Sequence, residues 1–240
     1  MSLLWRGLLL AILAFPGWAA DSAVKVPKGY KLVYSGDFKS AAGLKDYSFT
    51  DPLAWTWAAK TNAMALVTQS HYEPPFRSPF NIALLREKAV GDFVLEVELL
   101  QTSKEYGHRD MVLCFGFQDA AHFYYAHIAT AADDHAHNFF VVNGSPRTKI
   151  AKETTKGVDW GQGVWHKVRL ERVAATGTIK VFYDDLTKPI MTAEDKTFGA
   201  GRIGFGSFDD TGMVRNVRLW SPDASKAEGN PFEKVPPPRK

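Results

Sequence analysis

Five of the seven histidines in this 240-residue chain fall between His108 and His137. Imidazole titrates near neutral pH, so this grouping could supply a general acid or base, or ligands for a metal. Other polar residues share the same stretch: Arg109, Asp110, Gln118, Tyr125 and Asn138. A half-buried strand does not need this many reactive side chains on its outer face. The stretch therefore predicts a functional site on a β-scaffold and leaves the reaction open.

The main candidates in this stretch are Tyr125 and His127. In a strand over 122–128 they share one face, while the residues that alternate with them share the other. We interpret His127 as a general acid or base beside a phenol that hydrogen-bonds or stacks on a ligand, with His137 and Asp110 completing the catalytic set. The alternative is a hydrogen-bonded histidine on a solvated sheet face.

A second pair, His135 and His137, would project to one side of a strand. Together with Asp133, Asp134 or His127 they could hold a divalent metal. The alternatives are a loop without metal and a structural calcium on the aspartates. We assign no metal or other cofactor and keep the divalent ion as an open alternative.

The expected ligand-binding residues are polar side chains near these histidines: Arg109, His108, Gln118, His135, Asn138 and Arg147. Arg109 could present its fork of donors to sugar hydroxyls or to a uronate carboxylate. The competing reading is an ion pair with Asp110 or Glu105. Arg77 and Arg147 lie in expected loops, either at the rim of a groove or simply solvated.

The scaffold that must position these groups shows a period of two. Alternation runs through 92–99 and 111–117 and recurs in 122–128, 138–143, 165–172, 178–184, 202–208 and 214–220, with Gly, Asn or Asp turns between several of them. Many short strands at this spacing predict an all-β fold, an antiparallel two-sheet β-sandwich. Within it we assign Trp165-His166 to the scaffold and Phe208–Asp210 to a strand end and turn, outside the site.

The ends of the chain indicate the compartment. Met1 to Ala20 has Arg6, an apolar run and small residues before position 20, which is typical of a secretory signal peptide. Residues 21–29 form a lead-in, 30–220 a single domain, and 221–240, rich in Pro, Lys and Ser, a flexible tail. The lone Cys114 cannot form an internal disulfide and is expected in the core.

We therefore expect a secreted or periplasmic monomer without a membrane span in the mature chain. The net charge is +3 with acids and bases well mixed, which excludes the basic stripe of a nucleic-acid-binding protein.

Three segments carry a resemblance to a known superfamily: WHKVRLERVAATGTIKVFYDD, GRIGFGSFDDTGMVRNVRLW and GDFVLEVEL. They resemble strands of concanavalin A-like jelly rolls, nearest to laminin-G-like modules and the 3-keto-disaccharide hydrolase family. The resemblance covers roughly Tyr30 to Trp220 and implies an exported bacterial protein whose concave sheet face holds carbohydrate. On this basis we expect outward positions of the central strands to form the groove.

The resemblance leaves three functions open: a glycoside hydrolase of the 3-keto-disaccharide hydrolase type, a lectin-like binding module, and a polysaccharide lyase. Glu96 and Glu98 could be the two carboxylates of a glycoside hydrolase. Residues two apart on a strand lie about 6.6 Å apart, which is within the range for glycoside hydrolysis. Family-16 glucanases, which share the fold, carry Glu-x-Asp-x-x-Glu, whereas this chain ends the run in Gln101. We therefore favour a charged solvent face for the two glutamates.

Overall fold

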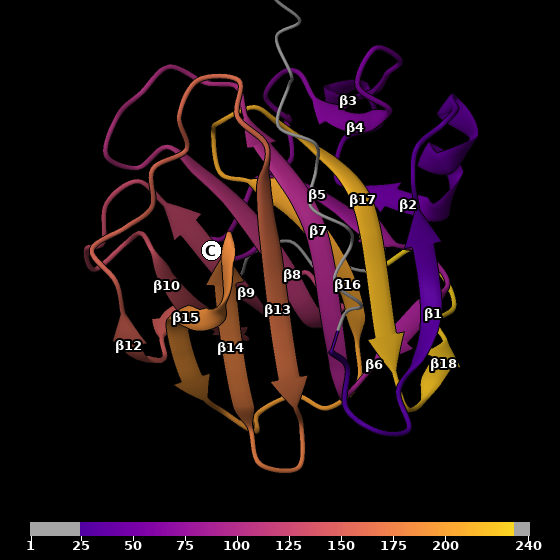
Figure 1. Cartoon of the computed structure of the whole chain (residues 1–240), viewed down its shortest axis with the longest axis vertical. Helices are drawn as coiled ribbons and strands as arrows, with labels where there is room; N and C mark the ends of the chain where they lie inside the picture. Colours follow the sequence, from indigo (N-terminus) through magenta and orange to yellow (C-terminus); the bar gives the residue numbers. More distant parts are fainter. Residues whose placement is uncertain (1–24, 233–240) are drawn as a thin grey trace, which may run out of the picture.

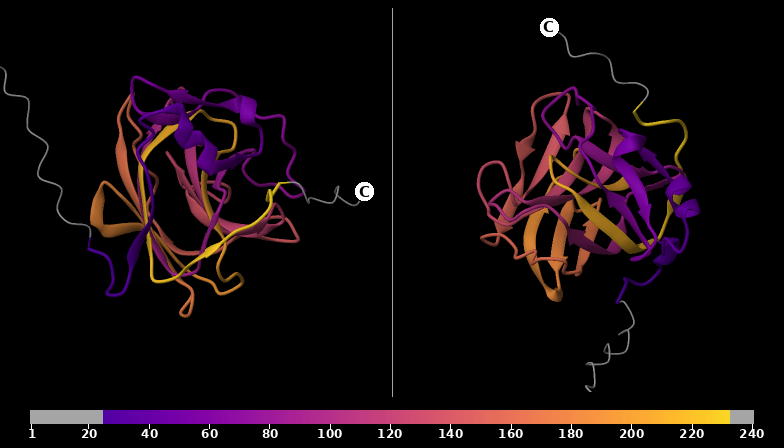
Figure 2. Two further views of the ribbon diagram at one scale, coloured as in Figure 1. Left: turned by 90° about the vertical axis from the view of Figure 1, so that its right-hand side faces the viewer. Right: turned by 90° about the horizontal axis from the view of Figure 1, so that it is seen from above.

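The computed structural model describes residues 25–232 of the chain. Two large antiparallel sheets lie face to face as the layers of a sandwich (Figures 1 and 2). The predicted all-β, antiparallel two-sheet class is confirmed. Two short 3-10 helices, η1 (Ala41–Asp46) and η2 (Pro52–Ala54), lie on connections. The predicted signal peptide lies outside the described residues, and within 25–232 no helix is long and apolar enough to cross a membrane.

The first sheet has nine strands and is in front in Figure 1. Its spatial order is β12 (Ala151–Thr154), β15 (Asp185–Glu194), β14 (Thr178–Tyr183), β13 (His166–Val173), β7 (Phe93–Gln101), β17 (Gly212–Ser221), β4 (Ala63–Leu66) and β3 (Trp55–Ala58), with β1 (Lys31–Gly36) also paired to β17.

The second sheet has seven strands and contains most of the histidine-rich stretch. Its order is β11 (Thr148–Lys149), β10 (Asn138–Asn143), β9 (His122–Ala129), β8 (Asp110–Asp119), β16 (Arg202–Ser207), β5 (Asn81–Leu85) and β2 (Tyr47–Phe49). A separate small ribbon pairs β6 (Lys88–Val90) with β18 (Ala224–Lys226).

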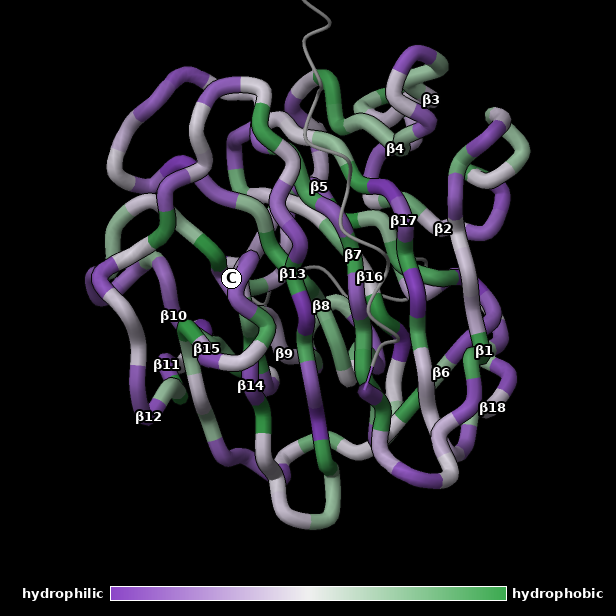
Figure 3. The backbone as a smooth tube through the Cα atoms, in the orientation of Figure 1, coloured by the Kyte–Doolittle hydropathy of each residue, from purple (hydrophilic) through white to green (hydrophobic). Residues whose placement is uncertain are grey.

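Alternation along each strand builds the core between the two sheets. Phe93, Leu95, Val97 and Leu99 of β7 are all buried there. Facing them, residues 124, 126 and 128 of β9 belong to the same core. Along β7 this core face alternates with Glu96 and Glu98, and Figure 3 shows hydrophobic and hydrophilic segments along that strand.

The opposite, outer face of the seven-stranded sheet carries a second apolar cluster. It includes Val112, Cys114, Tyr125 and Phe140, all buried. The residues that cover it come from the segment 67–80 and from the end of the described chain: Tyr72, Phe76, Phe80 and Phe232. The expectation that outward positions of the central strands line an open groove is therefore wrong for most of this face.

A bulge in β8 corrects one detail of the predicted alternation. Phe117 was expected to share a face with Met111, Leu113 and Phe115, but it belongs to the outer cluster. The register with β16 shifts by one residue between Cys114 and Phe117 of β8, and Gly116 in this stretch adopts φ +57°. One extra residue reverses the faces of the residues that follow it.

The last described segment is ordered on the body of the domain. After β18, the Arg202 guanidinium donates to the carbonyls of Glu228 (2.6 Å) and Gly229 (2.9 Å). The Phe232 ring then lies 5.8 Å from that of Phe117. The predicted flexible tail from residue 221 therefore starts too early, because a buried arginine and an aromatic contact hold residues 221–232 that the composition alone marked as loose.

Cys114 is buried on β8, as predicted, and burial raises the pKa of its thiol. Only the thiolate reacts with disulfide reagents. We expect native protein to resist labelling by such a reagent at pH 8 and to react with one equivalent once urea unfolds it. Rapid labelling of the native protein would contradict this burial.

Candidate functional site

A pocket of about 240 Å³ opens at one end of the seven-stranded sheet, where β8 begins and β9 and β16 end. We name it the sheet-end pocket. Ten residues line it: Arg77, Phe80, Tyr106, His108, Asp110, His127, His135, Arg147, Phe208 and Asp209. Two larger hollows, of about 520 and 470 Å³, lie beside β6 and β18 and contain none of the predicted site residues.

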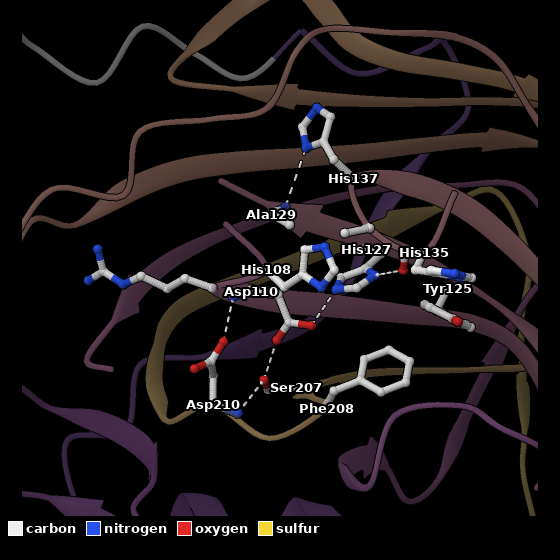
Figure 4. Close-up of polar contacts among 12 residues, drawn as sticks. His108, Asp110, Tyr125, His127, Ala129, His135, His137, Ser207, Phe208 and Asp210 are labelled. Carbon is white, nitrogen blue, oxygen red and sulfur yellow. Dashed lines mark hydrogen bonds and ion pairs between the residues drawn. The ribbon is translucent and has the colours of Figure 1, made fainter. Parts of the chain in front are cut away.

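Asp110 and His127 form an acid–base pair at the floor of the pocket (Figure 4). The ring Nδ1 of His127 donates to the backbone carbonyl of His135 at 3.1 Å, which turns Nε2 toward Oδ2 of Asp110. Because Nδ1 is held by this carbonyl, Nε2 is the ring nitrogen that can share a proton with Oδ2.

Both atoms that share this proton are shielded from solvent. The exposed fractions of His127 and Asp110 are 4% and 1%, and Nε2 and Oδ2 face each other. The other oxygen of Asp110 accepts from the Ser207 hydroxyl. A proton can therefore pass to a ligand only if the pair first separates.

The turn after β16 contributes residues to the sheet-end pocket, which the sequence analysis did not predict. Phe208 and Asp209 line the pocket, and Oδ2 of Asp210 accepts from the Asp110 amide (2.7 Å) and the Tyr106 hydroxyl (2.9 Å). Burial raises the pKa of the Asp210 carboxyl. Placing 208–210 outside the site was wrong, because the sheet order puts β16 beside β8, a non-local pairing that local sequence does not encode.

Arg147 forms one wall of the pocket, as expected for a rim arginine. Its guanidinium lies 4.4 Å from the ring centroid of Phe140 and 4.8 Å from that of Phe208. It donates to the hydroxyl of Tyr125 (2.7 Å) and to the carbonyl of His135 (2.9 Å). Cation–π contacts and two hydrogen bonds fix this side chain in one orientation.

Tyr125 does share a face with His127, as predicted, but it does not reach the pocket. Its side chain is fully buried, and its hydroxyl is covered by Arg147. Burial raises the pKa of this phenol further above its ordinary value. The structure therefore places it as support for Arg147 and not as a group that touches a ligand.

His137 lies apart from the pocket and points away from the Asp110–His127 pair (Figure 4). Its backbone adopts φ +48°, its Nδ1 accepts from the Ala129 amide (3.3 Å), and its Nε2 donates to the Thr155 hydroxyl (2.9 Å). Burial, with the nearby His127, lowers its pKa to about 4. The predicted catalytic placement of His137 is incorrect because both ring nitrogens are already used inside the protein.

Three expected ligand-binding residues also lie elsewhere. Arg109 is buried, and its guanidinium donates to Oε1 (2.9 Å) and to the backbone carbonyl (3.0 Å) of Gln101. It also donates to the backbone carbonyl of Gly161 (2.8 Å). Gln118 is near the other end of β8 and donates to the Ala200 carbonyl at 2.6 Å. Asn138 accepts from the Ala151 amide at 3.2 Å. These contacts hold strands and loops together, and none of the three side chains lines the sheet-end pocket.

The other two, His108 and His135, are exposed on the pocket rim. Nε2 of His108 lies 2.5 Å from Oδ2 of Asp133. The residues 130–137 form a loop, so His135 and His137 do not project to one side as a strand would require. Among residues 25–232, no group of three or more His, Cys, Asp or Glu side chains is arranged to hold a metal ion.

Glu96 and Glu98 lie on β7, in the other sheet, and neither lines the pocket. Each carboxylate pairs with an arginine: Oε1 of Glu96 with Arg169 (2.5 Å) and Oε2 of Glu98 with Arg215 (2.7 Å). The two glutamates are therefore charged and paired on the outer face, but Glu96 is buried, so the predicted solvent-exposed face is wrong for that residue. His166, assigned to the scaffold, is buried between Asp184 (2.8 Å) and the Trp160 carbonyl (3.0 Å).

Solved structures share this architecture and define the class of fold. A carbohydrate-binding module, CBM66 from Bacillus subtilis, is 19% identical, with a TM-score of 0.54 over 73% of this chain and 96% of its own. A Bacillus subtilis protein of unknown function with a galectin-like fold is 14% identical (TM-score 0.55; 82% and 100% covered). A putative glycosyl hydrolase from Parabacteroides distasonis is 12% identical (TM-score 0.52; 80% and 98% covered).

The domain is therefore a lectin-type jelly roll, and the expected concanavalin A-like fold is confirmed. At these identities the likeness establishes the fold alone. No family model matches the chain, and no curated protein matches it. The finer resemblance to the 3-keto-disaccharide hydrolases stays a prediction.

Proposed function

We propose that this domain binds a carbohydrate in the sheet-end pocket. The observation that carries the proposal is the pairing of aromatic walls with a polar rim. The rings of Phe80 and Phe208 pack edge to face at 5.6 Å, and Tyr106, His108 and His135 surround the opening. A sugar ring presents apolar C–H faces and polar hydroxyl edges, which such a pocket complements.

The size of the pocket favours one sugar unit over a long chain. Its volume of about 240 Å³ is below the roughly 300–1,000 Å³ that holds drug-sized ligands. Beyond it, the outer face of the sheet is covered by Tyr72, Phe76 and Phe232. A terminal sugar is therefore the ligand that fits without moving this cover.

The comparisons support the same proposal in a general way. They include a carbohydrate-binding module, peanut lectin (TM-score 0.50) and the carbohydrate recognition domain of Emp46p (TM-score 0.51). The N-terminal sequence leads us to propose further that the protein works after export, in the periplasm or outside the cell.

The test is binding to a panel of mono- and disaccharides measured by calorimetry. For a sugar that binds, we expect Phe208→Ala to weaken affinity about tenfold or more, since a central aromatic contact is commonly worth above 1.4 kcal/mol. Phe76→Ala is the matched control, because Phe76 packs on the same apolar cluster without lining the pocket. Equal effects of both variants, or no binding to any sugar, would contradict the proposal.

A second candidate function is cleavage of the bound sugar, and the Asp110–His127 pair is the observation that favours it. A buried acid–base pair at the floor of a pocket is a common arrangement for proton transfer. New reducing ends would indicate hydrolysis, and unsaturated ends that absorb ultraviolet light would indicate elimination. Binding without either product, or turnover that survives His127→Gln, would exclude catalysis by this pair.

A further inference from the structure

We propose that the ligand of the sheet-end pocket carries an anionic group, a carboxylate or a sulfate ester, which Arg77 and Arg147 bind. The inference rests on the proposed function and adds the chemical class of the sugar.

Arg147 supplies a cation that is held in place before any ligand arrives. Two aromatic rings and two neutral oxygens surround its guanidinium, and within residues 25–232 it forms no ion pair with a carboxylate. A half-buried cation with neutral partners only is stabilised strongly by an anion that enters beside it.

Arg77 supplies a second cation on the same pocket. It is exposed in the segment that covers the outer face of the sheet, and its side chain has no hydrogen bond or ion pair with another residue of 25–232. A guanidinium presents a planar fork of donors that matches the oxygens of a carboxylate or sulfate. Its donors are therefore available to a ligand.

The acidic groups around the pocket are mostly engaged. Asp110 is shared between His127 and Ser207, Asp210 accepts from the Asp110 amide and Tyr106, and Asp133 contacts His108. Of the two carboxylates that line the pocket, Asp209 is the one whose side chain has no such partner within 25–232.

Two arginines of the other sheet offer a comparison. On the outer face of the nine-stranded sheet, Arg169 and Arg215 each contact a glutamate, so their charges are balanced within the protein. In the sheet-end pocket neither Arg77 nor Arg147 forms an ion pair with a carboxylate of residues 25–232. Two guanidinium groups without such partners fit an acidic sugar better than a neutral one.

The experiment compares sugars that differ in one group. Methyl glucuronide is paired with methyl glucoside, methyl galacturonide with methyl galactoside, and galactose 6-sulfate with galactose, all by calorimetry at pH 7. We expect an acidic member to bind at least tenfold tighter than its neutral partner, and this preference to shrink from about 0.05 to about 0.5 M NaCl. The glucuronide and galacturonide pairs test for a carboxylate, and the galactose 6-sulfate pair tests for a sulfate ester.

Arg77→Gln should weaken binding of the acidic sugar about tenfold and should change binding of its neutral partner little. Lys180→Gln is the matched control, since Lys180 is an exposed cation on β14 of the other sheet. Arg147→Lys, which keeps the charge but loses the fork, should give an intermediate loss.

The outcomes separate the two proposals. Equal binding of acidic and neutral partners overturns the anionic inference and leaves carbohydrate binding intact. A preference for acidic sugars that neither arginine variant reduces overturns it as well. If no sugar of any kind binds, the proposed function itself fails.

Discussion

Replacing Asp110 by alanine is expected to lower the free energy of unfolding by about 3 kcal/mol, because it leaves a buried imidazole and a buried hydroxyl without their partner. Nε2 of His127 loses the oxygen it faces, and the Ser207 hydroxyl loses its acceptor. The exposed neighbour Asp209 is the control, and Asp209→Ala should change stability by less than about 0.5 kcal/mol. Urea unfolding at pH 7 measures both.

The variant Asp110→Asn separates the loss of the charge from the loss of the hydrogen bonds. Its amide nitrogen can donate to Nε2 of a neutral His127 while its carbonyl accepts from Ser207, so both buried partners stay satisfied. We expect Asp110→Asn to cost about 1 kcal/mol, close to the net value of one hydrogen bond. A loss for Asp110→Ala no greater than that for Asp209→Ala would show that the pair does not stabilise the fold.

His137 is expected to make the protein sensitive to acid. Its folded pKa is about 4, lowered from 6.5 mainly by burial, and protonation at Nδ1 would break the bond from the Ala129 amide. Between these values the unfolded chain binds the proton and the folded chain does not, so stability falls as the pH drops from about 6.5 toward 4. The full loss is on the order of 3 kcal/mol.

The variant His137→Asn isolates this contribution. Asparagine tolerates the positive φ at this position, and its side-chain oxygen can accept from the Ala129 amide without titrating. Urea unfolding at pH 7.5, 5.5 and 4.5 should show a shallower loss for the variant than for the unchanged protein, while His135→Asn in the same loop keeps the original slope. Parallel slopes for all three proteins would contradict the assignment.

Much of the fold could be predicted because each strand has its own alternating pattern. The structure places the predicted faces of β7 and β9 in the core between the sheets, although the opposite face of β9 is buried as well, in the outer cluster. The prediction failed where one residue changes the register, as at Gly116, or where contacts from elsewhere order a polar segment, as Arg202 does for residues 228–229.

The site was harder to predict because it is assembled from distant segments. Asp110, His127 and His135 meet through the β8–β9 pairing and the loop that follows, and all three were candidates from local spacing. Phe208 was missed because it reaches the pocket only through the pairing of β16 with β8. Arg109 and His137 were overrated, since sequence does not show that their donors and acceptors are used within the protein.

The cover formed by residues 67–80 and Phe232 has a consequence for how such a domain could diversify. The strip of sheet beneath it is apolar and continuous with the pocket at Phe80 and Phe208. A shorter connection in that region would expose this strip to solvent. Under the proposed function, the pocket for one sugar ring would then become a longer groove, and a surface loop would set the length of the ligand while the sheets stay as they are.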